Sequence, residues 1–227
     1  IYTLSLHDAL PIWSALARAE GPEDFAETLR QALRFALFIV LPASLGLMLI
    51  SGPFVHLVFV RGEFNDWAWR ATSSCLALSM LGLPGMACST VVMRALYALS
   101  MPRAAFKTTL FSVAATALLS AALMLPMGYD GLALAPSIAF TLSGLLGLRY
   151  VRGKLGRSLN VLSRTWLAKT AAALAALALA TTAWRLALPY RPEAALTLRA
   201  AWHLGVIVVG MATYADQIGR ASCRERV

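Results

Sequence analysis

Long apolar stretches without a single charged residue are the feature that most constrains this chain. Residues 71–93 and 108–129, for example, hold no Asp, Glu, Lys or Arg. About 20 mostly apolar residues in a helix cross the roughly 30 Å hydrocarbon core of a bilayer, so each stretch is long enough to span a membrane. Charged residues make up only 14% of the chain, against about a quarter in soluble domains. We therefore predict an all-α integral membrane protein with about six transmembrane helices.

Short connections join the predicted helices. Their expected ranges are 33–50, 71–93, 105–125, 131–150, 166–188 and 199–215. Ser51-Gly-Pro53 breaks the first helix, and the apolar run then continues from 54 to 60. The connection from Pro126 to Asp130 is short, so the third and fourth helices are expected to form an antiparallel hairpin.

Basic residues flank the apolar runs and are distributed unequally. If residues 13–32 form a cytoplasmic connection, twelve Lys and Arg residues lie on the cytoplasmic side and five on the other side. The positive-inside rule favours this orientation. Residues 33–150 then hold four transmembrane helices, 151–165 form a basic cytoplasmic connection, and 166–216 hold the last two helices. The net charge of +9 is not gathered on the face of a folded domain, so no nucleic-acid partner is expected.

Prolines inside the predicted helices mark candidate hinges or kinks. They are Pro42 in the first helix and Pro84, within Gly82-Leu-Pro-Gly85, in the second. A proline removes one backbone hydrogen bond and bends a helix. Broken helices often line the substrate site of transporters, whereas a kink can also serve packing alone. The sequence leaves both interpretations open for Gly82, Pro84 and Gly85.

Groups that could carry catalysis are scarce. Between residues 13 and 216 the only histidines are His56 and His203, both in apolar surroundings near predicted helix ends, where a structural role is expected. The three cysteines form no CxxC pair, and no two carboxylates share a membrane helix face. We expect neither an enzyme nor a metal site or cofactor. Asp130 and Glu63 are interpreted as solvated turn residues.

Arg94 is a candidate for contact with a substrate. Arg94 lies ten residues after Pro84, which is about 15 Å along a helix axis. If Pro84 marks the middle of the membrane, Arg94 lies near its boundary. There it serves either as a snorkelling anchor or as a bidentate partner for a lipid pyrophosphate at the cytoplasmic side.

The two ends of the chain break the pattern of their neighbours. Residues 1–12 and 217–227 resemble translated sequencing-adaptor read-through. We predict that neither end belongs to the biological sequence, and that the rest is a slice of a longer protein.

Four motifs in the same order resemble the MurJ/MviN family of lipid II flippases. They are Leu41-Pro42 with Ser51-Gly-Pro53 and Leu57-Val-Phe-Val-Arg-Gly-Glu-Phe64; Leu81-Gly-Leu-Pro-Gly85; Arg94-Ala-Leu-Tyr-Ala-Leu99; and Gly131-Leu-Ala-Leu-Ala135. The resemblance implies the C-terminal part of a fourteen-helix exporter of the multidrug/oligosaccharidyl-lipid/polysaccharide superfamily. Such proteins carry undecaprenyl-linked peptidoglycan precursor across the bacterial inner membrane by alternating access. The last two helices would form a groove for the lipid tail, and the partners would be the bilayer and the missing N-terminal helices.

The chain departs from the family in two places. After Leu99 the family often has Asp-Thr-Arg-Thr-Pro, of which only Arg103 is kept. By resemblance Arg103 joins Arg94 as a candidate substrate contact. Some members bind sodium through Asn or Asp in the third helix, where this chain has Thr116 and Ser120, so no sodium site is expected. The alternatives are a drug or polysaccharide-lipid exporter of the same superfamily, a membrane-embedded glycolipid enzyme, and a non-catalytic scaffold.

Overall fold

Seven helices account for most of the residues that the computed structural model describes. The structure describes residues 21–59, 64–156, 163–193 and 195–223. Within these ranges the helices are α2 (Pro22–Leu49), α3 (Ser51–Phe59), α4 (Asp66–Ala98), α5 (Pro102–Met127), α6 (Tyr129–Leu155), α7 (Arg164–Ala187) and α8 (Leu196–Cys223). All except α3 contain a segment that is long and apolar enough to cross a membrane. The predicted fold class is therefore confirmed.

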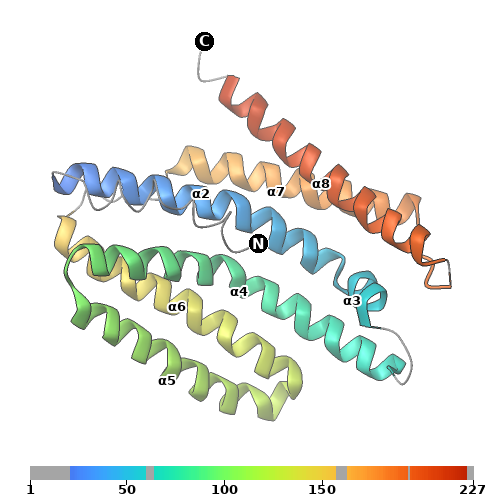
Figure 1. Cartoon of the computed structure of the whole chain (residues 1–227), viewed down its shortest axis with the longest axis horizontal. Helices are drawn as coiled ribbons and strands as arrows, with labels where there is room; N and C mark the ends of the chain where they lie inside the picture. The colour runs from blue at the N-terminus through green and yellow to red at the C-terminus, as the bar shows by residue number, and fades with distance from the viewer. Residues whose placement is uncertain (1–20, 60–63, 157–162, 194, 224–227) are drawn as a thin grey trace.

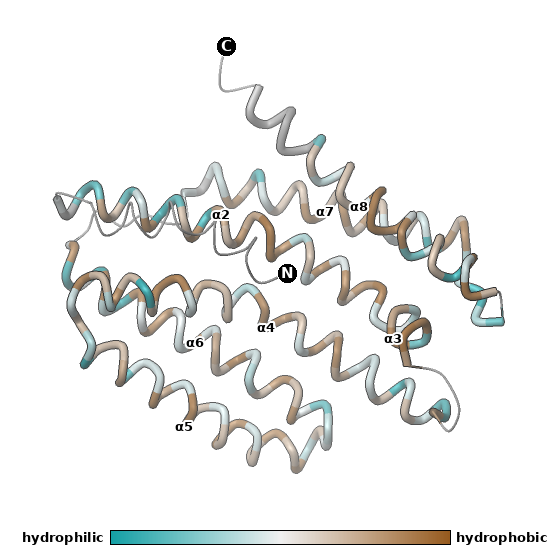
Figure 2. Tube along the Cα trace, in the orientation of Figure 1, coloured by the Kyte–Doolittle hydropathy of each residue, from teal (hydrophilic) through white to brown (hydrophobic). Residues whose placement is uncertain are grey.

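The long helices form two packed groups with α2 between them. α4, α5 and α6 lie side by side, while α7 and α8 form a separate hairpin, and α2 contacts both α4 and α7 (Figure 1). Hydrophilic residues gather toward the ends of α2, α4 and α7 (Figure 2). Large apolar side chains on α5, including Phe106, Val113 and Leu118, are exposed. In a membrane such a surface faces lipid or another protein segment.

Gly21-Pro22 predicts that a helix restarts near Glu23, and α2 begins at Pro22, but it is continuous with the first transmembrane helix. Residues 23–32, interpreted as a cytoplasmic connection, continue without a break into the first transmembrane helix. Pro22 occupies the first turn, where its missing N–H costs nothing, and Glu23 and Asp24 favour the positive end of the helix dipole. The amphipathic pattern of these residues also buries Phe25 and Leu29, so tertiary packing extends the helix.

The predicted break at Ser51-Gly-Pro53 is confirmed. α2 ends at Leu49 and α3 begins at Ser51. Backbone carbonyls at this break gain side-chain donors: Arg185 Nη1 donates to the Leu49 carbonyl at 2.8 Å, and Trp69 Nε1 donates to the Gly52 carbonyl at 2.8 Å. The Leu49 carbonyl, at the end of α2, needs such a partner because no helical N–H reaches it.

The hairpin between α5 and α6 is also confirmed, and it is tighter than expected. Gly128 alone connects the two helices, at a φ of 61°, in the left-handed region that favours glycine. Its neighbour Gly131 lies so close to α5 that an added Cβ would sit 2.5 Å from the carbonyl carbon of Leu123. Small residues at this turn let two antiparallel helices meet almost directly.

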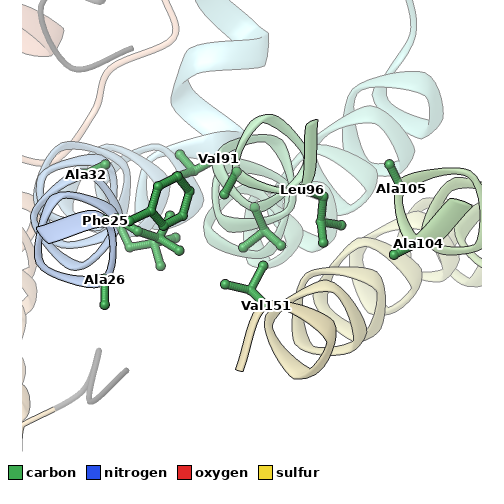
Figure 3. Close-up of a cluster of buried hydrophobic side chains, with 12 residues drawn as sticks. Phe25, Ala26, Ala32, Val91, Leu96, Ala104, Ala105 and Val151 are labelled. Atoms are coloured by element: carbon green, nitrogen blue, oxygen red, sulfur yellow. The ribbon is translucent and has the colours of Figure 1, made fainter. Parts of the chain in front are cut away.

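A core of buried side chains holds one end of the bundle together. Phe25, Leu29 and Leu33 of α2 pack with Val92 and Leu96 of α4. Ala104 and Ala105 of α5 and Val151 of α6 complete this core (Figure 3). The core fixes four helix ends against one another.

Small residues line the contact between α4 and α6. A Cβ added to Gly82 would lie 2.6 Å from Ser137 Cβ, and one added to Gly85 would lie 2.8 Å from Thr141 Cα. Farther along, Ser89 faces Gly144. Rows of small residues like this one let helix backbones approach closely in lipid. α4 continues through Pro84 as one helix, so the packing interpretation of Gly82 and Gly85 is the one that their contacts favour.

Candidate functional site

An apolar groove lies between α2, α7 and α8. It has a volume of about 350 Å³. Its lining comprises Ile39, Pro42, Ala43, Gly46, Leu47, Ile50, Phe54, Leu177, Thr181, Val206, Ile207, Gly210 and Met211. The one polar side chain, Thr181, donates its hydroxyl to the Leu177 carbonyl of its own helix at 2.8 Å. Because that hydroxyl is already bonded, the groove suits a hydrocarbon chain and gives a polar ligand little to bind.

Pro42 helps to build this groove through an unusual contact. A proline at position 42 cannot donate to the carbonyl four residues earlier, which is that of Phe38. Tyr214 of α8, almost fully buried, donates its hydroxyl to this carbonyl at 3.1 Å, and its ring lies 5.3 Å from that of Phe38. Membrane helices tolerate proline where a neighbour supplies such a partner. α8 is thereby fixed against the proline position of α2.

Polar contacts near both ends of α7 hold the hairpin against α2. Arg34 Nη2 lies 3.5 Å from Ser163 Oγ near one end, and Arg185 donates to Leu49 at the other. Between them, Leu45 packs against the buried cluster of Ala173, Leu177 and Tyr214. These contacts hold α7 and α8 against α2, and the groove lies between the three helices.

A second hollow opens on the other side of α2, between α4 and α6. Its volume is about 550 Å³, and it is lined by Leu33, Leu37, Pro84, Gly85, Cys88, Thr141, Gly144, Leu145, Leu148, Arg149 and Arg152. Its wall is mainly apolar, with two arginines from the last turns of α6. Of the residues predicted as hinges in α4, Pro84 and Gly85 therefore line a hollow, whereas Gly82 packs against Ser137.

The two predicted substrate contacts lie at the same end of the bundle but not in one pocket. Arg94 is exposed near the end of α4. Arg103, in the first turn of α5, lines a shallow hollow of about 470 Å³ with Lys107 and Tyr150. Arg94 is not part of that hollow's lining.

Arg149 and Arg152, which line this second hollow, are candidate binding residues that the sequence interpretation missed. They were counted only as flanks of a connection, with a helix boundary set at 150. α6 in fact runs to Leu155 and is followed by Gly156 at a φ of 74°. Glycine after a basic last turn is a common helix end, and this signal could have extended the predicted helix, which already contains Arg149, to include Arg152.

Asp130 differs from its interpretation as a solvated turn residue. It is half-buried in the first turn of α6, and its carboxylate accepts a hydrogen bond from Ser74 Oγ of α4 at 2.6 Å. A carboxylate is also favoured at the positive end of a helix dipole. Asp130 thus joins two helices, while Glu63 lies outside the described residues.

Three other polar residues singled out from the sequence have structural partners. Thr116 donates to the Ser112 carbonyl at 2.8 Å, as expected of a hydroxyl within a helix. His56 and His203 belong to a cluster of rings that joins α3 to α8. Within the described ranges, no three His, Cys, Asp or Glu residues are grouped as a metal site would require.

Comparison with known proteins decides the family. Residues 2–196 match the family described as lipid II flippase MurJ. The chain belongs to this family. A probable lipid II flippase MurJ from Rhizobium meliloti is 31% identical over 218 residues, which is 94% of this chain and 41% of that protein. The lipid II flippase MurJ of Thermosipho africanus is 28% identical over 57% of the chain and 26% of its own length.

The fold agrees with a solved structure of the same family. That structure, a lipid II flippase MurJ in an inward closed conformation, has a TM-score of 0.74 and 20% sequence identity. The match covers 92% of this chain and 41% of the solved one. Aligned over 94% of its residues with the Rhizobium meliloti protein and over 92% with this solved structure, the chain spans about two fifths of the length of each.

MurJ membership confirms the family that the four motifs resemble. MurJ proteins are multi-pass proteins of the bacterial inner membrane and are transporters, not enzymes. The exporter, glycolipid-enzyme and scaffold alternatives are not favoured by these matches. The family match begins at residue 2, within the segment predicted to be artefactual, and α8 extends to Cys223, past the boundary predicted at 216. The non-biological origin of both ends stays a prediction.

Proposed function

We propose that this chain forms the C-terminal part of a lipid II flippase, and that the groove between α2, α7 and α8 holds the hydrocarbon tail of the lipid-linked peptidoglycan precursor. The observation that carries this proposal is the groove's lining, in which the one hydroxyl is already bonded within its own helix. Such a surface gains free energy by contact with an apolar chain and offers little to a sugar or a phosphate. The lining also includes residues of α8 and α7, the last two helices, where the family resemblance places a tail groove.

In the proposed mechanism, the polar headgroup crosses the membrane through a central cavity while the tail stays in hydrocarbon. One lobe rocks against the other in alternating access. α2, α4, α5 and α6 supply part of one lobe, and α7 with α8 supplies the groove. The polar contacts of Arg34 and Arg185 keep the groove attached to that lobe.

Filling the groove tests this proposal. In a full-length flippase that carries this segment, Gly210→Phe is expected to abolish lipid II flipping, because the new ring occupies the space of the tail. A Cβ at Gly210 would meet its nearest neighbour, Thr181 Oγ1, at 3.8 Å, so the helix contact itself tolerates a side chain. Lipid II exposure on the outer face of the membrane is the measurement, alongside growth in a flippase-depletion strain.

Val208→Phe is the matched control. Val208 lies on the same helix, is 63% exposed and does not line the groove. This variant is expected to keep normal flipping at equal protein level in the membrane. Normal flipping by the Gly210→Phe variant, at equal protein level, would contradict the tail-groove assignment.

We further propose that Arg94 and Arg103 contact the precursor's pyrophosphate on the cytoplasmic side. Support comes from their shared end of the bundle and from the hollow that Arg103 forms with Lys107. Arg103→Gln is expected to lower flipping by about threefold to tenfold through loss of charge-assisted hydrogen bonds. The same assay on Arg70→Gln, an exposed arginine near the opposite end of α4, gives the control. Equal rates for both variants would remove Arg103 from the site, and Arg94→Gln is tested in the same way.

A further inference from the structure

A fourth pocket lies at the turn joining α7 to α8, at the end of the bundle opposite the basic helix ends. Its volume is about 420 Å³. The lining includes two arginines, Arg191 and Arg199, and three large aromatic side chains, Trp184, Tyr190 and Trp202. No carboxylate contributes to the lining. Among the residues that the structure describes, neither arginine forms an ion pair with an acidic side chain.

Two hydrogen-bond donors of this pocket are buried without an acceptor. They are the indole N–H of Trp184 and the Nε–H of Arg199. A buried donor left unpaired costs free energy, and most such groups in proteins have a partner. Both groups can only donate. The wall of the pocket therefore holds two unsatisfied donors, and its two guanidinium groups favour a ligand that carries negative charge.

The surrounding residues hold these donors in place. His56 Nδ1 lies 3.1 Å from the Tyr190 hydroxyl and 3.4 Å from Arg199 Nη1. A guanidinium can only donate, so Nδ1 is the acceptor and carries no proton. Burial, and then the positive charge of Arg199, lower the pKa of His56, which agrees with a neutral ring at this position. Arg199 Nη1 is thus used for positioning, while Arg199 Nε has no partner among the described residues.

The aromatic side chains are fixed as well. Trp202 Nε1 donates to the Leu188 carbonyl at 2.7 Å, and His203 Nδ1 donates to the Arg199 carbonyl at 2.7 Å. The Tyr190 ring centroid lies 5.3 Å from that of Trp202 and 5.5 Å from that of His203. Hydrogen bonds and ring contacts therefore build the pocket before any ligand arrives.

We infer that this pocket binds a phosphate group, and that the phosphate belongs to the headgroup of an anionic membrane lipid. The pocket lies where two membrane-spanning helices end, which is the depth of lipid headgroups and of aromatic belts. Arginine and indole donors match phosphate oxygens, and Ala187, Leu188 and Leu198 give the pocket an apolar side for the adjoining lipid. This site is separate from the tail groove and independent of the proposed function.

Binding of short-chain lipids to the purified 227-residue chain in a neutral detergent tests the inference. Dihexanoyl-phosphatidylglycerol is expected to bind and to raise the unfolding temperature, with a dissociation constant measured by thermal-shift titration. Trp184→Phe keeps an aromatic ring but removes the indole donor, and Arg199→Gln removes the charge. Arg199→Gln is expected to bind the lipid at least about tenfold more weakly, because hydrogen bonds to charged groups are among the stronger ones.

The control variant is Arg70→Gln, which removes one positive charge outside the pocket lining. It should bind like the unmodified chain. Equal binding by the Arg199→Gln, Trp184→Phe and unmodified chains would overturn the site. Trp184→Phe keeps this test valid if Arg199→Gln fails to fold. Equal stabilisation by inorganic phosphate alone would overturn the lipid assignment and leave a free-phosphate site.

Discussion

Replacing Gly85 by alanine is expected to destabilise the chain by about 3 kcal/mol, toward the upper end of overpacking effects. The new methyl group would sit 2.8 Å from Thr141 Cα, and a backbone atom cannot rotate away. α4 and α6 must then separate along their whole contact, and Gly82→Ala has the same consequence through Ser137. The free energy of unfolding, from SDS titration of the chain in mixed micelles followed by circular dichroism, measures the effect.

Gly153→Ala provides the matched control on α6. Nothing lies within 4 Å of a Cβ at this position, and alanine favours a helix more than glycine does by up to about 1 kcal/mol. The control is therefore expected to be neutral or slightly stabilising. If Gly85→Ala and Gly153→Ala gave the same unfolding free energy, the close approach of α4 and α6 would be wrong.

The second large effect is expected from Leu96→Ala in the core that joins α2, α4, α5 and α6. Leu96 is 0% exposed, and Figure 3 shows it among side chains of neighbouring helices. Its truncation leaves a cavity that rigid helices cannot close, at a cost of about 3 kcal/mol. Lipid does not fill this space because the core is enclosed by protein. SDS titration again gives the free energy of unfolding.

Leu125→Ala is the control for this experiment. Leu125 lies near the end of α5 and is 91% exposed, so its truncation opens no cavity and should change stability by less than about 0.5 kcal/mol. A loss at Leu125 as large as that at Leu96 would mean that the described packing of α5 is incomplete. A small loss at Leu96 would mean that the core can collapse around the missing side chain.

Several features of this fold could be predicted from the sequence because they depend on local chemistry. Charge-free apolar runs set the six spans, since no other arrangement satisfies their backbone in lipid. Ser51-Gly-Pro53 set the break, and the short connection around Gly128 set the hairpin. Motifs in a fixed order also indicated the family. The extent of the helices was less accurate, as where residues 23–32 join the first transmembrane helix and where α6 runs on to Leu155, because amphipathic or basic turns join a helix when tertiary contacts favour them.

The candidate sites depend on contacts between distant parts of the chain. Apolar residues of α2, α7 and α8 look alike in sequence whether they face lipid or a groove, because membrane helices are apolar on both sides. Only the fold brings Tyr214 to the carbonyl freed by Pro42. Only the fold places Trp184 and Arg199, each with an unpaired donor, in the lining of one pocket. The sequence by itself determined that the chain crosses a membrane, where its first membrane helix is interrupted, and to which family it belongs. The tertiary structure decided which apolar faces form grooves and which polar groups meet, because these depend on helix packing and not on hydrophobicity.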